Sequence, residues 1–189
     1  AQRLSGVFAH PWNMTLGAIQ DESLVREISK RMAEQNKSLG VHINFSPSVD
    51  VNNNSKNPII GNRSLGEDPI NVYRKAKAYI QGHKDVGVYT SIKHFPGHGD
   101  TDKDSHKTLP IISGNMKKLN NVELFPFKKL IDEGLAESVM LAHLSVPAID
   151  KKYPSSLSYK TVGKLLREEY NFDGITVTDA LYMKGVLQD

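Results

Sequence analysis

Residues 93–106 combine, at high density, the side chains that proton-transfer chemistry uses. The segment contains three histidines, three aspartates, two lysines and two glycines within fourteen residues. Ordering a loop with so many titratable groups costs conformational free energy. Ligand binding or proton transfer by these groups would explain why the cost is met. The segment also follows the apolar run 86–92, and α/β enzymes place their active sites in the loops that follow strands. We therefore expect a functional site here.

Asp104 and His106 are the two residues of this segment best spaced to act together. Side chains two residues apart in an extended chain point the same way, so Asp104 can accept a hydrogen bond from one ring nitrogen of His106. The other nitrogen then faces a substrate with an unperturbed pKa of about 6.5, which suits a general acid or base at neutral pH. An Asp–His hydrogen bond that only stabilises the loop explains the same pair equally well.

Metal binding is the competing interpretation of the segment. Its aspartates resemble the start of a calcium loop, but Ser105 and Ile111 stand where that loop requires glycine and glutamate, which excludes calcium. The spacing of His94, His98 and His106 permits zinc, although the lysine beside the first of them would place a positive charge next to the ion. We therefore expect neither a metal nor another cofactor.

Three further polar residues lie in loops or at the ends of apolar runs. Asp179 follows the run 174–178, where it either reaches the catalytic face of a barrel or caps the next helix. Arg63 lies between glycines in the loop 46–67, where it either grips a polar ligand or pairs with a neighbouring carboxylate. His143 ends another apolar run and either lines the same substrate pocket or is a buried, hydrogen-bonded histidine.

These side chains must be positioned by the strands and helices around them. Four short apolar segments rich in β-branched residues are typical of parallel strands covered on both faces: 41–45, 88–92, 138–141 and 174–178. Amphipathic helical patterns alternate with them, in the segments 21–32, 69–83, 121–133 and 158–170. Strict alternation of strand and helix indicates βαβ units on a parallel sheet.

This pattern predicts an α/β fold that is part of a (β/α)8 TIM-type barrel. A closed barrel needs eight strands and four are recognisable. We therefore expect residues 1–189 to be the central fragment of a barrel domain that is truncated at both ends, with the remainder of the barrel supplied by a full-length chain. The long polar loops 46–67 and 93–120 follow strands, as the loops of a barrel enzyme do.

The amino-acid composition excludes several classes of binding partner and site. A content of 39% hydrophobic and 24% charged residues is ordinary for a globular domain, and a formal net charge of +3 is too small to indicate nucleic-acid binding. No apolar run approaches the roughly 20 residues of a membrane span. The sequence has no cysteine, which excludes disulfides and thiolate metal sites but leaves the compartment undetermined.

Four sequence blocks in the chain resemble the signatures of one enzyme family. The run Lys-His-Phe-Pro-Gly-His-Gly-Asp-Thr from residue 93, followed by Asp-Ser-His at 104–106, resembles the signature of family 3 glycoside hydrolases and, within it, of the β-N-acetylglucosaminidase branch. The blocks at 62–66, 140–143 and 175–179 are similar to three further blocks of the family. Their common order over nearly the whole chain makes the resemblance specific.

The resemblance implies a role for each candidate residue. Asp179 matches the nucleophile, which forms a covalent glycosyl-enzyme intermediate. Asp104 and His106 match the acid/base pair, which protonates the leaving oxygen and then activates water. The groups that hold the hydroxyls and the N-acetyl arm of the terminal sugar are matched by Arg63, Lys93 and His94.

The implied activity is that of a bacterial, retaining, exo-acting β-N-acetylglucosaminidase. It would remove terminal β-linked N-acetylhexosamine from peptidoglycan fragments or related glycans. A phosphorylase is the first alternative, because a histidine acid/base does not repel an incoming phosphate. A non-catalytic sugar-binding relic is the second, although the joint presence of Asp104, His106 and Asp179 speaks against it. We expect this fragment alone to be inactive or poorly folded, because an open sheet exposes its edges and apolar faces.

Overall fold

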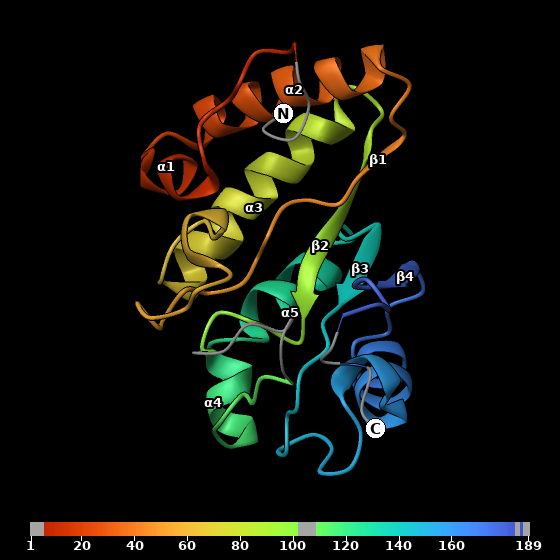
Figure 1. Ribbon diagram of the computed structural model, residues 1–189. Coiled ribbons are helices and arrows are strands. Elements are labelled where there is room, and N and C mark those ends of the chain that lie inside the picture. Colours follow the sequence, from red (N-terminus) through yellow and green to blue (C-terminus); the bar gives the residue numbers. More distant parts are fainter. Residues whose placement is uncertain (1–5, 102–108, 184–185, 187–189) are drawn as a thin grey trace.

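The computed structural model describes residues 6–101, 109–183 and 186. In this part of the chain, four strands form one parallel sheet in the order β1-β2-β3-β4 (Figure 1): β1 (Ile43–Asn44), β2 (Tyr89–Phe95), β3 (Ser138–Leu141) and β4 (Ile175–Thr178). The predicted α/β class is confirmed. Because every pair is parallel, the carboxyl ends of all four strands lie at one edge of the sheet, and the loops that follow them meet there.

The first strand is much shorter than predicted. Residues 41–45 were expected to form it, but regular pairing with β2 covers only Ile43 and Asn44. Pro47 lacks the N–H that a regular ladder needs. The chain nevertheless continues beside β2, because Ser91 N–H donates to Ser46 O at 3.2 Å and Val49 N–H donates to Lys93 O at 2.8 Å.

Two long helices lie side by side, α2 (Glu22–Ser38) and α3 (Pro69–Lys84), and α3 packs on β2 (Figure 1). Each begins as its sequence predicts. The carboxylate of Asp21 accepts from Ser23 N–H at 2.8 Å, and that of Asp68 accepts from Asn71 N–H at 2.7 Å. The two helices approach closely at Gly82, where a β-carbon would lie 2.3 Å from Arg26 O.

The predicted helix 121–133 is wrong in its extent. Only its part from residue 125 forms one helix, α5 (Phe125–Asp132), whereas residue 121 ends a separate helix, α4 (Met116–Asn121). Pro126 explains the break: it cannot donate a helical hydrogen bond and restricts the residue before it, so it is tolerated only in the first turn of a new helix. Gly134, at φ 64°, follows the end of α5, as the sequence predicts.

The remaining helices are short or irregular. The predicted helix 158–170 is present as a π-helix, η3 (Lys160–Glu169). Three short helices had no sequence prediction, because six residues or fewer carry too little periodicity: α1 (Asn13–Ala18), η1 (Gly61–Arg63) and η2 (Ser155–Leu157). No helix of the described residues has the length and apolar character that crossing a membrane requires.

The core lies between the two central strands and the helices that cover them. Phe95 of β2 is fully buried and packs edge to face on Phe127 of α5, with ring centroids 5.3 Å apart. Every residue of β3 is buried, whereas Ile175 of the edge strand β4 is 59% exposed. Full burial of a side chain such as phenylalanine contributes roughly 1.5–3 kcal/mol, so β2 and β3 are the most firmly held strands and provide a rigid base for the loops that follow them.

Candidate active site

Asp50, in the loop after β1, is the centre of a buried hydrogen-bond cluster. Its Oδ1 accepts from the backbone N–H of His94 at 3.1 Å and of His98 at 2.7 Å. Its Oδ2 lies 2.7 Å from His94 Nδ1 and accepts from Ser48 Oγ at 2.6 Å. Burial alone would raise the pKa of this carboxyl, but the hydrogen bonds and attraction from His94 outweigh burial and hold the pKa well below its usual range.

The orientation of the His94 ring follows from its two neighbours. Arg63 has no acceptor, so its Nη2 must donate to His94 Nε2, which lies 3.2 Å away. In this arrangement the ring proton is on Nδ1 and is donated to Asp50. A chain of contacts therefore runs from Asp50 through His94 to Arg63, and it aligns the guanidinium with the end of β2.

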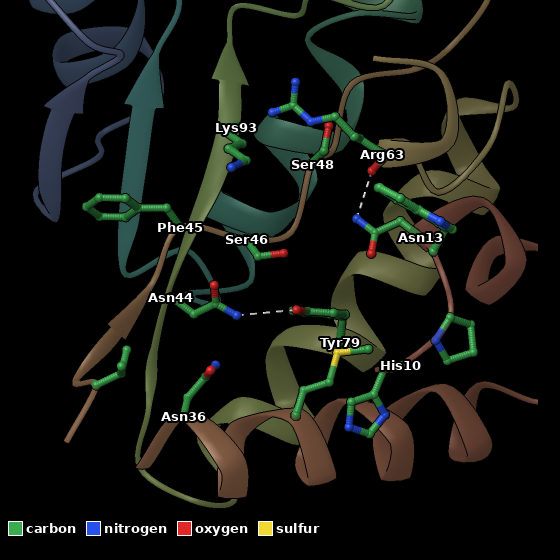
Figure 2. Close-up of a pocket in the computed structure, with 14 residues that line it drawn as sticks. His10, Asn13, Asn36, Asn44, Phe45, Ser46, Ser48, Arg63, Tyr79 and Lys93 are labelled. Carbon is green, nitrogen blue, oxygen red and sulfur yellow. Dashed lines mark hydrogen bonds between the residues drawn. The ribbon is translucent and has the colours of Figure 1, made fainter. Parts of the chain in front are cut away.

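Arg63 and Lys93 both line one pocket beside β1 and β2, with a volume of about 420 Å³ (Figure 2). Lys93 extends into it from β2, and Arg63 from the end of η1. Ser46 and Ser48 add hydroxyl groups to the wall, and Asn44 adds an amide that donates to the hydroxyl of Tyr79 at 3.4 Å. The two cationic side chains and the hydroxyl and amide groups can hydrogen-bond the oxygens of a polyhydroxylated ligand, while Trp12, Met32 and Phe45 supply an apolar part of the wall.

The histidine-rich segment after β2 is packed tightly against the loop after β1. A β-carbon on Gly99 would lie 1.8 Å from Val51 O, so only glycine permits this approach. His98 is 2% exposed, and burial lowers its pKa to about 4, which keeps the ring neutral at pH 7. Its Nδ1 lies 2.8 Å from Thr101 Oγ1.

Asp179 follows β4 at the same edge of the sheet. Its backbone N–H donates to Leu141 O at 2.8 Å, which extends the ladder between β3 and β4 by one bond. Its Oδ1 accepts from Ala180 N–H at 2.8 Å, and the residue is partly exposed. The carboxylate therefore stands at the carboxyl end of a barrel-type strand, as the sequence predicts.

His143, after β3, lies next to the Asp179 segment. Its Nε2 is 3.2 Å from Ala180 O, a pure acceptor, and its Nδ1 is 2.7 Å from Ser156 Oγ. Nε2 therefore carries the proton in this arrangement, and Nδ1 accepts from Ser156. Burial lowers the pKa of His143, although the Ala180 carbonyl and Asp179 act in the opposite direction.

The structure thus brings together three of the predicted sugar-binding residues, Arg63, Lys93 and His94, and separately places His143 beside the Asp179 segment. Asp104 and His106 belong to residues 102–108, which lie outside the described residues. The described residues contain no group of three histidine, aspartate or glutamate side chains arranged to hold a metal ion.

Sequence reasoning missed two residues that organise the site, Asp50 and Asn57. Asp50 anchors His94, and Asn57 bonds to the backbone of the histidine-rich segment. A partial signal for Asp50 was available, since it is a carboxylate in the loop 46–67 that follows the predicted strand 41–45. Asn57 carried no comparable signal, because asparagine in a polar loop is most simply a turn residue.

Comparison with known proteins identifies the family of the chain. The sequence matches the Glycosyl hydrolase family 3 N terminal domain over residues 1–189. It is 37% identical over 188 residues to beta-hexosaminidase A of Pseudoalteromonas piscicida, covering 92% of this chain and 31% of that protein. The chain therefore belongs to glycoside hydrolase family 3.

Solved structures agree with this family and with the fold. A family 3 beta-N-acetylglucosaminidase from Paenibacillus sp. str. FPU-7 has a TM-score of 0.94 and 42% identity, over 97% of this chain and 35% of that chain. The beta-glucoside phosphorylase BglX has a TM-score of 0.89 and 32% identity, over 93% and 33%. The chain thus spans about a third of each of these three proteins, and its sheet is an unclosed part of a TIM-type barrel.

Proposed function

We propose that this chain provides the catalytic face of a retaining, exo-acting β-N-acetylglucosaminidase. The observation that carries the proposal is the convergence of Arg63, Lys93 and His94 on one side of the strand-end edge where β4 presents Asp179. Relatives named beta-hexosaminidase and beta-N-acetylglucosaminidase support N-acetylglucosaminides as the substrate class. Peptidoglycan fragments and related glycans carry that sugar at their ends. Residues 1–189 would be the central part of the barrel domain.

The proposed chemistry is a double displacement at the anomeric carbon. The Asp179 carboxylate attacks this carbon and forms a glycosyl ester, while His106, oriented by Asp104, protonates the departing oxygen. The same histidine then removes a proton from water, whose oxygen attacks the anomeric carbon from the face that the leaving group occupied and displaces the Asp179 carboxylate. Two inversions leave the configuration retained. Arg63, Lys93 and His94 would hold the hydroxyl and N-acetyl groups of the terminal sugar, with Asp50 keeping His94 in place.

Hydrolysis of a chromogenic β-N-acetylglucosaminide by the complete protein tests this proposal. We expect Asp179→Asn to abolish turnover. We expect His106→Ala to lose about a hundredfold or more with a poor leaving group, because acid catalysis contributes that much, and far less with an activated one. A folded, complete parent protein that binds N-acetylglucosamine without turnover would instead indicate a sugar-binding barrel.

A phosphorylase is the second candidate, favoured by the likeness to a beta-glucoside phosphorylase. Phosphate would replace water in the second displacement and leave as a sugar 1-phosphate. Turnover in phosphate-rich and phosphate-free buffer separates the two reactions. Turnover that requires phosphate and yields a sugar 1-phosphate would establish the phosphorylase and contradict the hydrolase.

A further inference from the structure

The segment that carries Asp179 is attached at two points to the stretch of chain where β3 ends. The Asp179 backbone N–H donates to Leu141 O at 2.8 Å, and Ala180 O lies 3.2 Å from His143 Nε2. Leu141 is the last residue of β3, and His143 follows it by two positions. Between the two attachments, the Ala180 N–H donates to the Asp179 carboxylate at 2.8 Å. The proposed nucleophile is therefore held between two bonds to one neighbouring stretch.

The bond from His143 attaches the chain to the sheet just beyond the ladder between β3 and β4. That ladder pairs Leu141 with Thr178 as its last register position, and the Asp179 N–H adds one further bond. The turn 180–183 is then closed by the Met183 N–H, which donates to Ala180 O at 3.1 Å. This second bond shapes the turn from within. The bond from His143 to the same carbonyl oxygen joins the turn to β3.

The ring of His143 is itself firmly held. It is 1% exposed, and its Nδ1 lies 2.7 Å from Ser156 Oγ. The neighbouring Ser155 Oγ donates to Ala142 O at 2.6 Å and accepts from Leu144 N–H at 3.2 Å. The backbone on both sides of the histidine is thus fixed by one serine and its ring by the next. With one nitrogen donating to a carbonyl and the other accepting from a hydroxyl, the neutral ring has no donor left for a sugar hydroxyl.

We propose that His143, held by Ser156, is a positioning residue for Asp179 and makes no contact with the sugar. This role rests on the proposed function of Asp179 as the nucleophile. Among the described strands β4 pairs only with β3, so the direction of the carboxylate depends on what fixes the chain just after the strand. Displacement at the anomeric carbon tolerates a narrow range of approach, and a misplacement of about 1 Å can cost about a hundredfold in rate.

Two substitutions of His143 separate its two hydrogen bonds. His143→Gln places an amide N–H about where Nε2 lies, so it keeps a donor for Ala180 O and loses the acceptor for Ser156. His143→Asn is the matched control, because its shorter side chain places an oxygen near Nδ1, which keeps the Ser156 bond and loses the Ala180 bond. We would measure kcat/KM of the complete protein with phenyl and 2,4-dinitrophenyl β-N-acetylglucosaminides, together with the inhibition constant of N-acetylglucosamine. The ratio kcat/KM reports the first displacement, in which Asp179 attacks.

For His143→Asn we expect kcat/KM to fall about tenfold or more with both substrates, because nucleophilic attack is common to them. For His143→Gln it should stay within about threefold of the wild type, since the bond to Ala180 is kept. The inhibition constant should stay within about twofold in both variants, because neither removes a sugar-binding group. A loss confined to the phenyl substrate, a weakened inhibition constant, or a loss in His143→Gln that equals or exceeds that in His143→Asn would each overturn the proposal.

Ser156→Ala decides the question if the His143 variants do not fold. It keeps the imidazole and removes the hydroxyl that holds its other nitrogen. We expect kcat/KM to fall about threefold or more with both substrates at an unchanged inhibition constant, since the ring is then held from one side only. An unchanged kcat/KM or a weakened inhibition constant overturns the proposal. A complete wild-type protein that hydrolyses neither substrate overturns the proposed function and this role with it, whereas the contrary results in an active enzyme overturn the role alone.

Discussion

At the scale of single residues, Asp50 has the most demanding environment among the described residues of the site. The side chain is completely buried, yet its two oxygens make four hydrogen-bond contacts. A buried carboxylate is stable only when such partners replace its hydration. Because two of them are backbone N–H groups of the segment after β2, Asp50 determines both the path of that segment and the orientation of the His94 ring.

We predict that Asp50→Asn weakens sugar binding. The amide cannot accept at both positions, so the bonds to either His94 Nδ1 or the backbone are lost, which costs about 1–3 kcal/mol and raises the inhibition constant of N-acetylglucosamine about tenfold. Ser48→Ala removes one of the four contacts of the carboxylate, at 2.6 Å, together with one hydroxyl of the pocket wall, and should have a smaller effect. Unchanged binding in Asp50→Asn would show that His94 does not depend on the carboxylate.

At the scale of elements, a buried polar cluster joins α2, α3 and β1 below the pocket. His83 of α3 has Nδ1 2.7 Å from Ser29 Oγ and Nε2 3.0 Å from Asn44 Nδ2. Since Ser29 Oγ donates to Tyr79 O at 2.5 Å, it accepts from His83 Nδ1, and Nε2 accepts from Asn44. The neutral imidazole thus connects two helices to the short first strand, which has few ladder bonds of its own.

This cluster predicts a pH dependence of stability. Burial lowers the pKa of His83 to about 4, below its value of about 6.5 in an unfolded chain. Between these two values the unfolded state binds more protons, so the free energy of unfolding decreases as the pH falls, by up to about 1.4 kcal/mol per pH unit for this group. Urea unfolding of the complete protein at several pH values should therefore show that the free energy of unfolding decreases less steeply with falling pH in His83→Gln than in the wild type. Substitution of the exposed His42 is the control. If the free energy of unfolding depends equally on pH in the two variants, His83 is not the source of this dependence.

At the scale of the whole molecule, the sheet within the described residues has two open edges, β1 and β4. Phe45 beside β1 is 47% exposed and Ile175 of β4 is 59% exposed, whereas the residues of β3 between them are buried. An open parallel sheet with apolar side chains at its edges normally requires further strands or helices to cover it. This agrees with a chain that spans 31% of beta-hexosaminidase A of Pseudoalteromonas piscicida and 35% of the Paenibacillus beta-N-acetylglucosaminidase chain.

We predict that the 189-residue chain, produced alone, has no measurable turnover of a β-N-acetylglucosaminide and binds a hydrophobic dye at its exposed edges. The complete protein should bind little dye, because the rest of the barrel would cover the same side chains. Dye fluorescence and size-exclusion chromatography of the two proteins, compared at equal concentration, measure the difference. A monomeric, dye-negative and fully active 189-residue chain would contradict this prediction.

The sequence by itself determined the order of the elements and the chemical types at the strand ends. Apolar runs, the Asp21 and Asp68 caps, and the glycine after α5 are local signals, and local signals specify where helices and strands begin. The motif residues Lys93, His94 and Asp179 were likewise recognisable because their neighbours in the sequence form the family's signature.

Only the tertiary structure decided which side chains meet. The contacts of Asp50 with His94, of Arg63 with His94 and of Asn57 with residues 98–101 join positions 31 to 44 residues apart. No periodicity or spacing predicts such pairs, because they depend on the register of parallel strands and on the close approach that Gly99 permits. The sequence therefore indicated the chemistry of the site, and the packing of two loops against each other placed its groups.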